Sequence, residues 1–153
     1  MRKRILLITP PYHCGVVEAA GKWANLGLLY IAGELRKDGH HVEIYDAMAK
    51  NHSYADIREK IIDTIPDIVG STAYTATIYD ATQVLRLAKA INQNIITIIG
   101  GIHPTMMPQE TLTMGAGSID YIVRWEGEHT TPELIQAIQG KMKLTAVRGI
   151  AYR

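Results

Sequence analysis

The sequence predicts a doubly wound α/β domain, in which helices cover both faces of a five-stranded parallel sheet. Two observations predict this class. Short apolar runs rich in β-branched residues recur along the chain, bounded by Gly, Pro or Asp, as in strands that are buried on both faces. Helical patterns lie between these runs, and the alternation implies parallel strands joined by right-handed crossovers.

Five short runs are the expected strands. A further extended segment, TAVRGIAYR at 145–153, follows the last helix and predicts an extra strand at the C-terminal edge of the sheet. Because the chain stops inside this segment, we expect one domain over 1–153 that is a fragment of a longer protein. The five runs are RILLIT (4–9), HVEIYD (41–46), DIVGS (67–71), NIITIIG (94–100) and DYIVR (120–124).

Four helices are expected between and after these strands. The first ends before Gly39, a residue suited to a C-terminal cap. The second covers about 54–64. The last contains TTPEL, which predicts Pro132 in its first turn. The first and third helices carry apolar residues at helical spacing: Leu28, Leu29, Ala32 and Leu35, then Ile78, Ala81, Leu85, Ala88 and Ile91.

Composition limits the classes of function. The 153 residues are 47% hydrophobic and 20% charged, as in an ordinary globular domain. The formal net charge is +1 with scattered basic residues, so no nucleic-acid partner is expected. No apolar run approaches the roughly 20 residues of a membrane span. The single cysteine, Cys14, excludes an internal disulfide framework, and a cytoplasmic location is expected.

The carboxyl ends of the strands are the expected site, because ligands of doubly wound sheets bind where the strand order reverses. Two segments there are small and polar: GSTAYT at 70–75 and GGIHPT at 100–105. Glycine lets a bulky group approach the backbone, and Ser71 and Thr72 offer hydroxyls in the same slot. The alternative is that Gly100 and Gly101 only form a tight strand-to-helix turn.

Common ligands of this fold do not fit the first loop, TPPYHCG. It lacks the glycine patterns of Walker and dinucleotide sites. Its two prolines remove backbone donors that a flavin phosphate loop requires. A receiver domain needs acidic residues where Thr9 and Ser71 stand. Phosphate-dominated ligands and phosphoacceptor chemistry are therefore disfavoured.

The chain resembles the N-terminal, cobalamin-binding domain of cobalamin-dependent radical SAM enzymes. Ser71 with the Gly-Gly pair resembles the S-x-L and G-G pattern of cobalamin domains, and TPPY, NLGLLYIAGELRKDGHHVEIYDA, IIGGIHPT and IVRWEGE extend the resemblance. Its best-known type is the anaerobic magnesium-protoporphyrin IX monomethyl ester cyclase, beside radical methylases. The resemblance implies a bound cobalamin, whose nucleotide tail enters a slot beside the third and fourth strands.

The same resemblance implies further partners outside this chain. A 4Fe–4S cluster needs C-x-x-x-C-x-x-C, which a chain with one cysteine cannot supply. We therefore expect a downstream radical SAM domain that holds the cluster and S-adenosylmethionine, and no catalysis by this chain alone. Two alternatives stay open: a stand-alone corrinoid methyl carrier, and an α/β domain that binds a nucleotide or a protein partner instead of cobalamin.

Fifteen residues are the candidate cofactor contacts. Ser71 is expected to bond a polar atom of the tail, Tyr12 and Tyr74 to cover the macrocycle, and Glu126 with Gly127 to meet its amide edge, although a solvated turn also explains the last pair. His103 is either a contact or a helix cap. The full set is Tyr12, Leu26, Gly27, Ser71, Thr72, Ala73, Tyr74, Thr75, Gly100, Gly101, Ile102, His103, Pro104, Glu126 and Gly127.

No protein ligand to cobalt is expected. Related cobalamin domains carry D-x-H-x-x-G after the first strand, whereas this chain reads PPYHCG. Pro11 stands in place of the aspartate, and only Cys14 separates His13 from Gly15. The carboxylate that would orient a ligating imidazole is absent, so His13 is predicted not to bind the metal.

Overall fold

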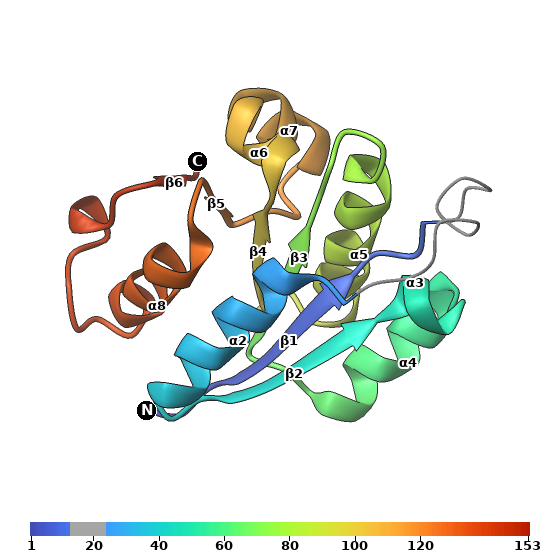
Figure 1. Cartoon of the computed structure of the whole chain (residues 1–153), viewed down its shortest axis with the longest axis horizontal. Helices are drawn as coiled ribbons and strands as arrows, with labels where there is room; N and C mark the ends of the chain where they lie inside the picture. Colours follow the sequence, from blue (N-terminus) through green and yellow to red (C-terminus); the bar gives the residue numbers. More distant parts are fainter. Residues whose placement is uncertain (13–23) are drawn as a thin grey trace.

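The computed structural model describes residues 1–12 and 24–153, in which six strands form one mostly parallel sheet in the order β2-β1-β3-β4-β5-β6. The α/β class agrees with the prediction (Figure 1). The edge strand expected near the C-terminus is short and runs antiparallel to its neighbour β5. The strands are β1 (Arg4–Thr9), β2 (His41–Asp46), β3 (Ile68–Thr72), β4 (Ile96–Gly100), β5 (Tyr121–Val123) and β6 (Ile150–Ala151).

The strand order reverses at β1. This strand pairs with β2 on one side and with β3 on the other, so the chain passes outward to β2 and then returns across β1. The strand register places Leu7 beside Gly70 and Thr72 beside Gly100. Sites in such sheets lie beyond the carboxyl ends of the strands at this reversal.

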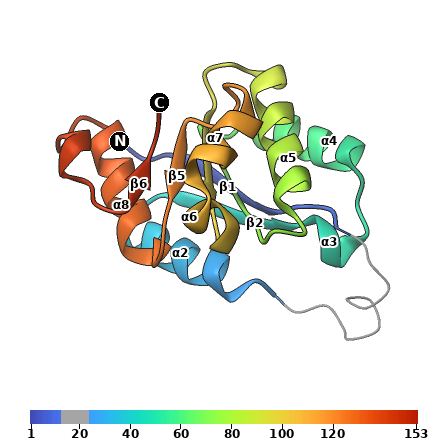
Figure 2. The same ribbon diagram turned by 90° about the horizontal axis from the view of Figure 1, so that it is seen from above.

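The helices cover both faces of the sheet (Figure 2). α2 and α8 lie on one face, and α4 and α5 lie on the other. Asn25 caps α2, because its side chain accepts from the Leu28 amide at 3.0 Å. The helices are α2 (Leu26–Lys37), α3 (Ala47–Lys50), α4 (Tyr54–Thr64), α5 (Ile78–Ile91), α6 (Ile102–Met106), α7 (Pro108–Gly115), α8 (Gly127–Ile138) and the 3-10 turn η1 (Leu144–Ala146).

The expected start of the last helix was wrong. α8 begins at Gly127, so Pro132 lies inside the helix and not in its first turn. The reason is that the helix follows β5 almost directly, with Glu126 as its N-terminal cap residue. The preference of proline for the first turn of a helix therefore does not locate the start of α8. The C-terminal end of α2 agrees with expectation, since Gly39 follows it with a φ of +83°.

Alternate residues of the strands build two separate cores, as the period of a strand requires. Leu6 and Ile8 face α4 and α5, whereas Ile5 and Leu7 face α2 and α8. The second core contains Ile68, Ile98 and Val123 from the sheet, packed against Leu28, Ala32, Leu35, Leu134 and Ile135 of the two helices.

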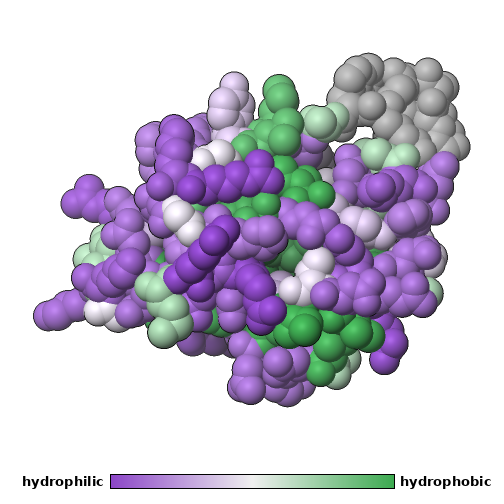
Figure 3. Space-filling model, turned by 90° about the horizontal axis from the view of Figure 1, so that it is seen from below, coloured by the Kyte–Doolittle hydropathy of each residue, from purple (hydrophilic) through white to green (hydrophobic). Residues whose placement is uncertain are grey.

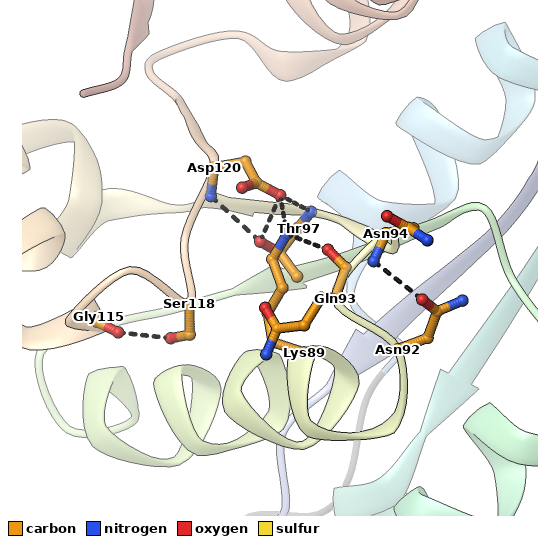
Figure 4. A network of polar contacts seen from close by, with 8 residues as sticks. All are labelled: Lys89, Asn92, Gln93, Asn94, Thr97, Gly115, Ser118 and Asp120. Atoms are coloured by element: carbon orange, nitrogen blue, oxygen red, sulfur yellow. Dashed lines mark hydrogen bonds and ion pairs between the residues drawn. The ribbon is translucent and has the colours of Figure 1, made fainter.

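Side chains satisfy the backbone at the N-terminal edge of the sheet. The Arg4 amide, at the start of β1, donates to Asp67 at 2.7 Å. The Thr97 amide, in β4, donates to Asp120 at 2.8 Å. The same carboxylate accepts from the Thr97 hydroxyl and pairs with Lys89 of α5 at 2.6 Å (Figure 4). Thr97, Asp120 and Lys89 therefore form a connected polar network at this edge.

The exposed surface is mixed. Hydrophilic residues cover most of the face in Figure 3, and hydrophobic residues gather in smaller areas between them. Among the described residues, no helix combines the length and apolar character needed to span a membrane.

Candidate functional site

A cavity of about 170 Å³, here called the slot, lies between α2, α8 and the sheet. The sheet forms its floor and the two helices form its walls. The floor residues come from four adjacent strands, so the slot crosses the place where the strand order reverses. Its lining is Ile5, Leu7, Asn25, Gly27, Leu28, Ile31, Ile68, Gly70, Ser71, Thr72, Ile98, Gly100, Gly101, Val123, Trp125, Glu126, Gly127, Glu128, Thr131 and Ile135.

Two glycines leave part of the floor bare. Gly70 of β3 and Gly100 of β4 fall on the face that carries Ile68 and Ile98, because residues two apart in a strand share a face. A Cβ on Gly70 would lie 2.7 Å from Cδ2 of Leu7, so any side chain there would intrude on the slot's lining. The sheet is therefore open to a flat group at this point.

The helical walls are close and mainly apolar. Leu28 and Ile31 come from α2, and Gly127 and Thr131 come from the first turns of α8. A Cβ on Gly127 would lie 2.8 Å from Cδ1 of Ile31, so this glycine permits the close approach of the two helices. Thr131 is 5% exposed, and no described residue forms a hydrogen bond with its hydroxyl.

A second cavity of about 390 Å³, here called the upper cavity, adjoins the mouth of the slot. Asn25, Gly27 and Thr72 line both spaces. Thr9, at the end of β1, lines the upper cavity and is 7% exposed, and its hydroxyl has no partner among the described residues. The remaining lining is Pro10, Ala24, Leu26, Met48, Tyr74 and Thr77.

Large apolar side chains are exposed around this edge. Leu26 is 65% exposed and Trp125 is 66% exposed, with Tyr74 and Ile102 also more than half exposed. The guanidinium of Arg124 lies 5.9 Å from the Trp125 ring centroid. An apolar rim above a narrow apolar slot suits a ligand with a broad flat part and a narrower tail.

The structure places nine of the fifteen predicted contacts in the two cavities. Gly27, Ser71, Thr72, Gly100, Gly101, Glu126 and Gly127 line the slot, and Leu26 and Tyr74 line the upper cavity. The other predicted contacts line neither cavity: Tyr12, Ala73, Thr75, Ile102, His103 and Pro104.

Gly101 lines the slot and also permits the tight turn between β4 and α6. Its φ is +101°, and a Cβ on it would lie 2.5 Å from the Ala73 carbonyl oxygen and 2.9 Å from Oγ1 of Thr72. Few residues other than glycine adopt such a conformation, and no side chain fits this contact. The tight-turn explanation therefore holds for Gly101, whereas Gly70 and Gly100 supply the bare floor.

The Ser71 hydroxyl already has an internal partner. It donates to the Ile8 carbonyl at 3.0 Å, and the residue is 4% exposed. Because Ser71 pairs with Ile8, its side chain belongs to the face opposite Gly70. The hydroxyl hydrogen is thus committed, and only the lone pairs of the oxygen remain for a ligand.

His103 does not cap a helix. The N-terminal cap position of α6 is Gly101, and no side chain caps that helix. Nδ1 of His103 lies 3.3 Å from Oγ1 of Thr75, while its Nε2 is buried with no partner among the described residues. The imidazole thus connects α6 to the loop after β3.

Sequence reasoning missed several lining residues. Gly70 could have been found from the alternation of β3, since it precedes Ser71 and shares a face with Thr72. Thr131, Ile135 and Ile31 had no comparable signal, because their position depends on how α2 packs against α8.

Some predictions fall outside the described residues. His13 and Cys14 belong to this group, so the predicted absence of a histidine ligand stays a prediction. Within the parts of the chain that the structure describes, no group of three or more His, Cys, Asp or Glu residues could hold a metal ion.

Comparison with known proteins gives consistent matches. The B12 binding domain family matches residues 12–135. The anaerobic magnesium-protoporphyrin IX monomethyl ester cyclase of Rubrivivax gelatinosus is 44% identical over 153 residues, covering 97% of this chain and 27% of that protein. An uncharacterized methyltransferase of Pyrococcus horikoshii is 38% identical over 151 residues, covering 98% of this chain and 32% of its own length.

A solved structure has the same fold. The cobalamin-dependent S-adenosylmethionine radical enzyme OxsB, with aqua-cobalamin and S-adenosylmethionine bound, superimposes with a TM-score of 0.81 at 24% identity, covering 99% of this chain and 21% of that chain. These matches confirm the resemblance that the sequence motifs indicated. The chain spans only about a third or less of its relatives' lengths, at 27% and 32%.

Proposed function

This chain belongs to the B12-binding domain family, and from that premise we propose that it holds cobalamin with the nucleotide tail in the slot and the corrin on the apolar rim. The bare floor at Gly70 and Gly100, enclosed by α2 and α8, is the observation that carries the proposal. It provides a narrow apolar space for an aromatic base beside the third and fourth strands.

The slot has a suitable size and character for an aromatic base. It measures about 170 Å³. Apolar cavities of roughly 150 Å³ lined by aliphatic residues bind benzene in an engineered protein. Leu7, Ile98 and Ile135 give this slot a comparable lining. The residues present therefore fit the flat base at the end of the cobalamin tail.

The rim supplies contacts for the corrin. Leu26, Tyr74 and Trp125 offer exposed apolar surface next to the slot's mouth. Glu126 lines the mouth just before α8, where its carboxylate can accept hydrogen bonds from the amide side chains of the corrin. These contacts orient the macrocycle without a protein bond to cobalt.

The domain serves a longer enzyme in this proposal. We propose that 1–153 is one domain and that a radical SAM domain downstream holds the 4Fe–4S cluster and S-adenosylmethionine. Bound cobalt would supply methyl-transfer or redox chemistry, and this chain would bind and position it. A parent gene without a downstream C-x-x-x-C-x-x-C segment would instead favour a stand-alone methyl carrier.

Equilibrium dialysis with hydroxocobalamin tests the proposal. Gly70→Leu fills the slot and should weaken binding at least roughly a hundredfold, and Gly70→Ala should weaken it less. Arg58→Ala, on the exposed side of α4 across the sheet, is the control and should bind as the parent does. Unfolding curves must show that the Gly70 variants fold. Unchanged affinity in folded Gly70→Leu would place the ligand elsewhere.

The coordination of cobalt needs a separate test. We expect no histidine ligand, and the tail in the slot also removes its base from the metal. Electron paramagnetic resonance of bound cob(II)alamin should then show no nitrogen splitting. Protein grown with nitrogen-15 histidine distinguishes the alternatives, because a histidine-derived triplet becomes a doublet and a benzimidazole-derived triplet persists. A doublet would show that a histidine does ligate cobalt.

A further inference from the structure

Thr131 is an unusual residue within the slot. Several helical threonines donate to the carbonyl four residues earlier, as Thr82 does to Ile78 at 2.8 Å and Thr111 to Met107 at 2.8 Å. Among the described residues, no such bond or any other engages the Thr131 hydroxyl, although the residue is only 5% exposed. The oxygen is not among the described side-chain atoms that are fully enclosed without a partner, so it reaches the space of the slot and is free to bond a ligand there.

The hydroxyl lies among the lining groups of the slot. Oγ1 of Thr131 is 3.6 Å from the position of a Cβ on Gly127, and both residues line the cavity. Thr131 is one turn further into α8 than Gly127 and Glu128, which are at the helix start near the mouth. The hydroxyl is thus placed to reach a group that has passed the mouth.

The other polar side chains of the slot are already engaged or lie at its entrance. The side-chain oxygen of Asn25 accepts from the Leu28 amide. Ser71 donates to Ile8. Glu126 and Glu128 flank the start of α8. The rest of the lining is aliphatic or glycine, apart from Thr72 and Trp125 at the rim. A base in the slot therefore meets the Thr131 hydroxyl inside a mainly apolar enclosure, with the Thr72 hydroxyl at the rim.

Resting on the proposed binding of cobalamin, we infer that the slot selects the lower base of the cofactor through Thr131. A benzimidazole drawn away from cobalt exposes one ring nitrogen, which accepts one hydrogen bond from the Thr131 hydroxyl. An adenine base carries an exocyclic amine and additional ring nitrogens. Those groups would lose water without gaining partners, which disfavours a purine. The preferred ligand is a cobamide with a benzimidazole-class base.

Three cobamides test the selection by equilibrium dialysis. They differ only in the lower base, which is dimethylbenzimidazole, adenine or a phenol without any ring nitrogen. The adenine form should bind at least roughly tenfold more weakly than the benzimidazole form. Equal affinity of these two forms would overturn the inference while leaving cobalamin binding intact. Absence of binding by all three forms would overturn the proposed function itself.

Substitutions at Thr131 assign the preference to its hydroxyl. Thr131→Val keeps the side-chain shape and should weaken the benzimidazole form roughly three- to thirtyfold. The phenol form should bind this variant as it binds the parent, because it has no nitrogen to lose a partner. Thr131→Ser should restore binding of the benzimidazole form. Equal losses for the benzimidazole and phenol forms would indicate damage to the slot and contradict a specific hydrogen bond.

Discussion

The two ends of the sheet differ in how their polar groups are engaged, although Oε1 of Gln139, beside Met1 at the N-terminal end, is also buried without a described partner. At the N-terminal edge, Asp120 accepts from the amide and hydroxyl of Thr97 and pairs with Lys89 (Figure 4). At the C-terminal edge, Thr9 and His103 each keep a buried polar atom that no described residue engages. Both edges belong to the same parallel strands, so strand geometry alone does not explain the difference.

The difference separates groups that stabilise the fold from groups, such as the Thr9 hydroxyl at the upper cavity, that are available to a ligand. A typical internal hydrogen bond contributes about 1 kcal/mol, and an unpaired buried group costs about as much or more. Such a cost persists at functional sites, where the ligand later supplies the partner. Substitutions at the N-terminal edge should therefore change stability, and those in the slot should change binding.

The largest expected effect is a difference in stability between alanine substitutions at two glycines of the C-terminal edge, Gly101 and Gly70. Gly101→Ala should destabilise the fold by about 3 kcal/mol, because a φ of +101° suits glycine and the new Cβ meets the Ala73 backbone. Gly70→Ala should change stability by less than about 1 kcal/mol, since its Cβ meets only the flexible end of Leu7. Urea unfolding measures both. Equal losses would contradict the distinction between turn and floor.

A somewhat smaller effect is expected at the N-terminal edge. Asp120→Ala removes the acceptor of the Thr97 amide and the ion-pair partner of Lys89, which keeps its bond to the Gln93 carbonyl, and should cost about 2 kcal/mol. Glu34→Ala, which removes an exposed pair with Lys37, is the matched control and should cost less than about 0.5 kcal/mol. Cobalamin affinity of folded Asp120→Ala should equal that of the parent. A large loss of affinity would mean that the two edges are coupled.

The sequence was sufficient for the strands and much of the site's location. Apolar runs rich in isoleucine and valine mark every parallel strand, and Ser71 and Gly100 mark the edge of the sheet at which the slot lies. The role of Gly101 was harder, because the sequence does not show that Ala73 lies against it. No sequence pattern indicates that Thr131 lines the slot, because its burial depends on the packing of α8 against α2. The start of α8 was also misplaced because Pro132 suggested a later first turn.

The smallest expected effect is a pH dependence of stability at the N-terminal edge. Burial lowers the pKa of His40 from 6.5, assisted by the positive charges of Lys141, the N-terminal amine and Lys3 and opposed by Asp38. Its neutral Nδ1 accepts from the Lys3 amide at 3.1 Å. Because the folded pKa lies below the unfolded one, the unfolded state binds more protons as pH falls through 6.5. Stability is therefore fully present above that pH and declines below it.

Urea unfolding at about pH 7.5 and about pH 5.5 measures this decline. In His40→Gln the side-chain oxygen can still accept from the Lys3 amide, but it does not titrate, so the loss of stability on acidification should be smaller than in the parent. His41→Gln, at the exposed neighbouring position, controls for the removal of one histidine. An identical decline in the parent and in His40→Gln would show that other groups cause it. A reduced decline would assign to the N-terminal edge a titrating group whose proton is linked to folding.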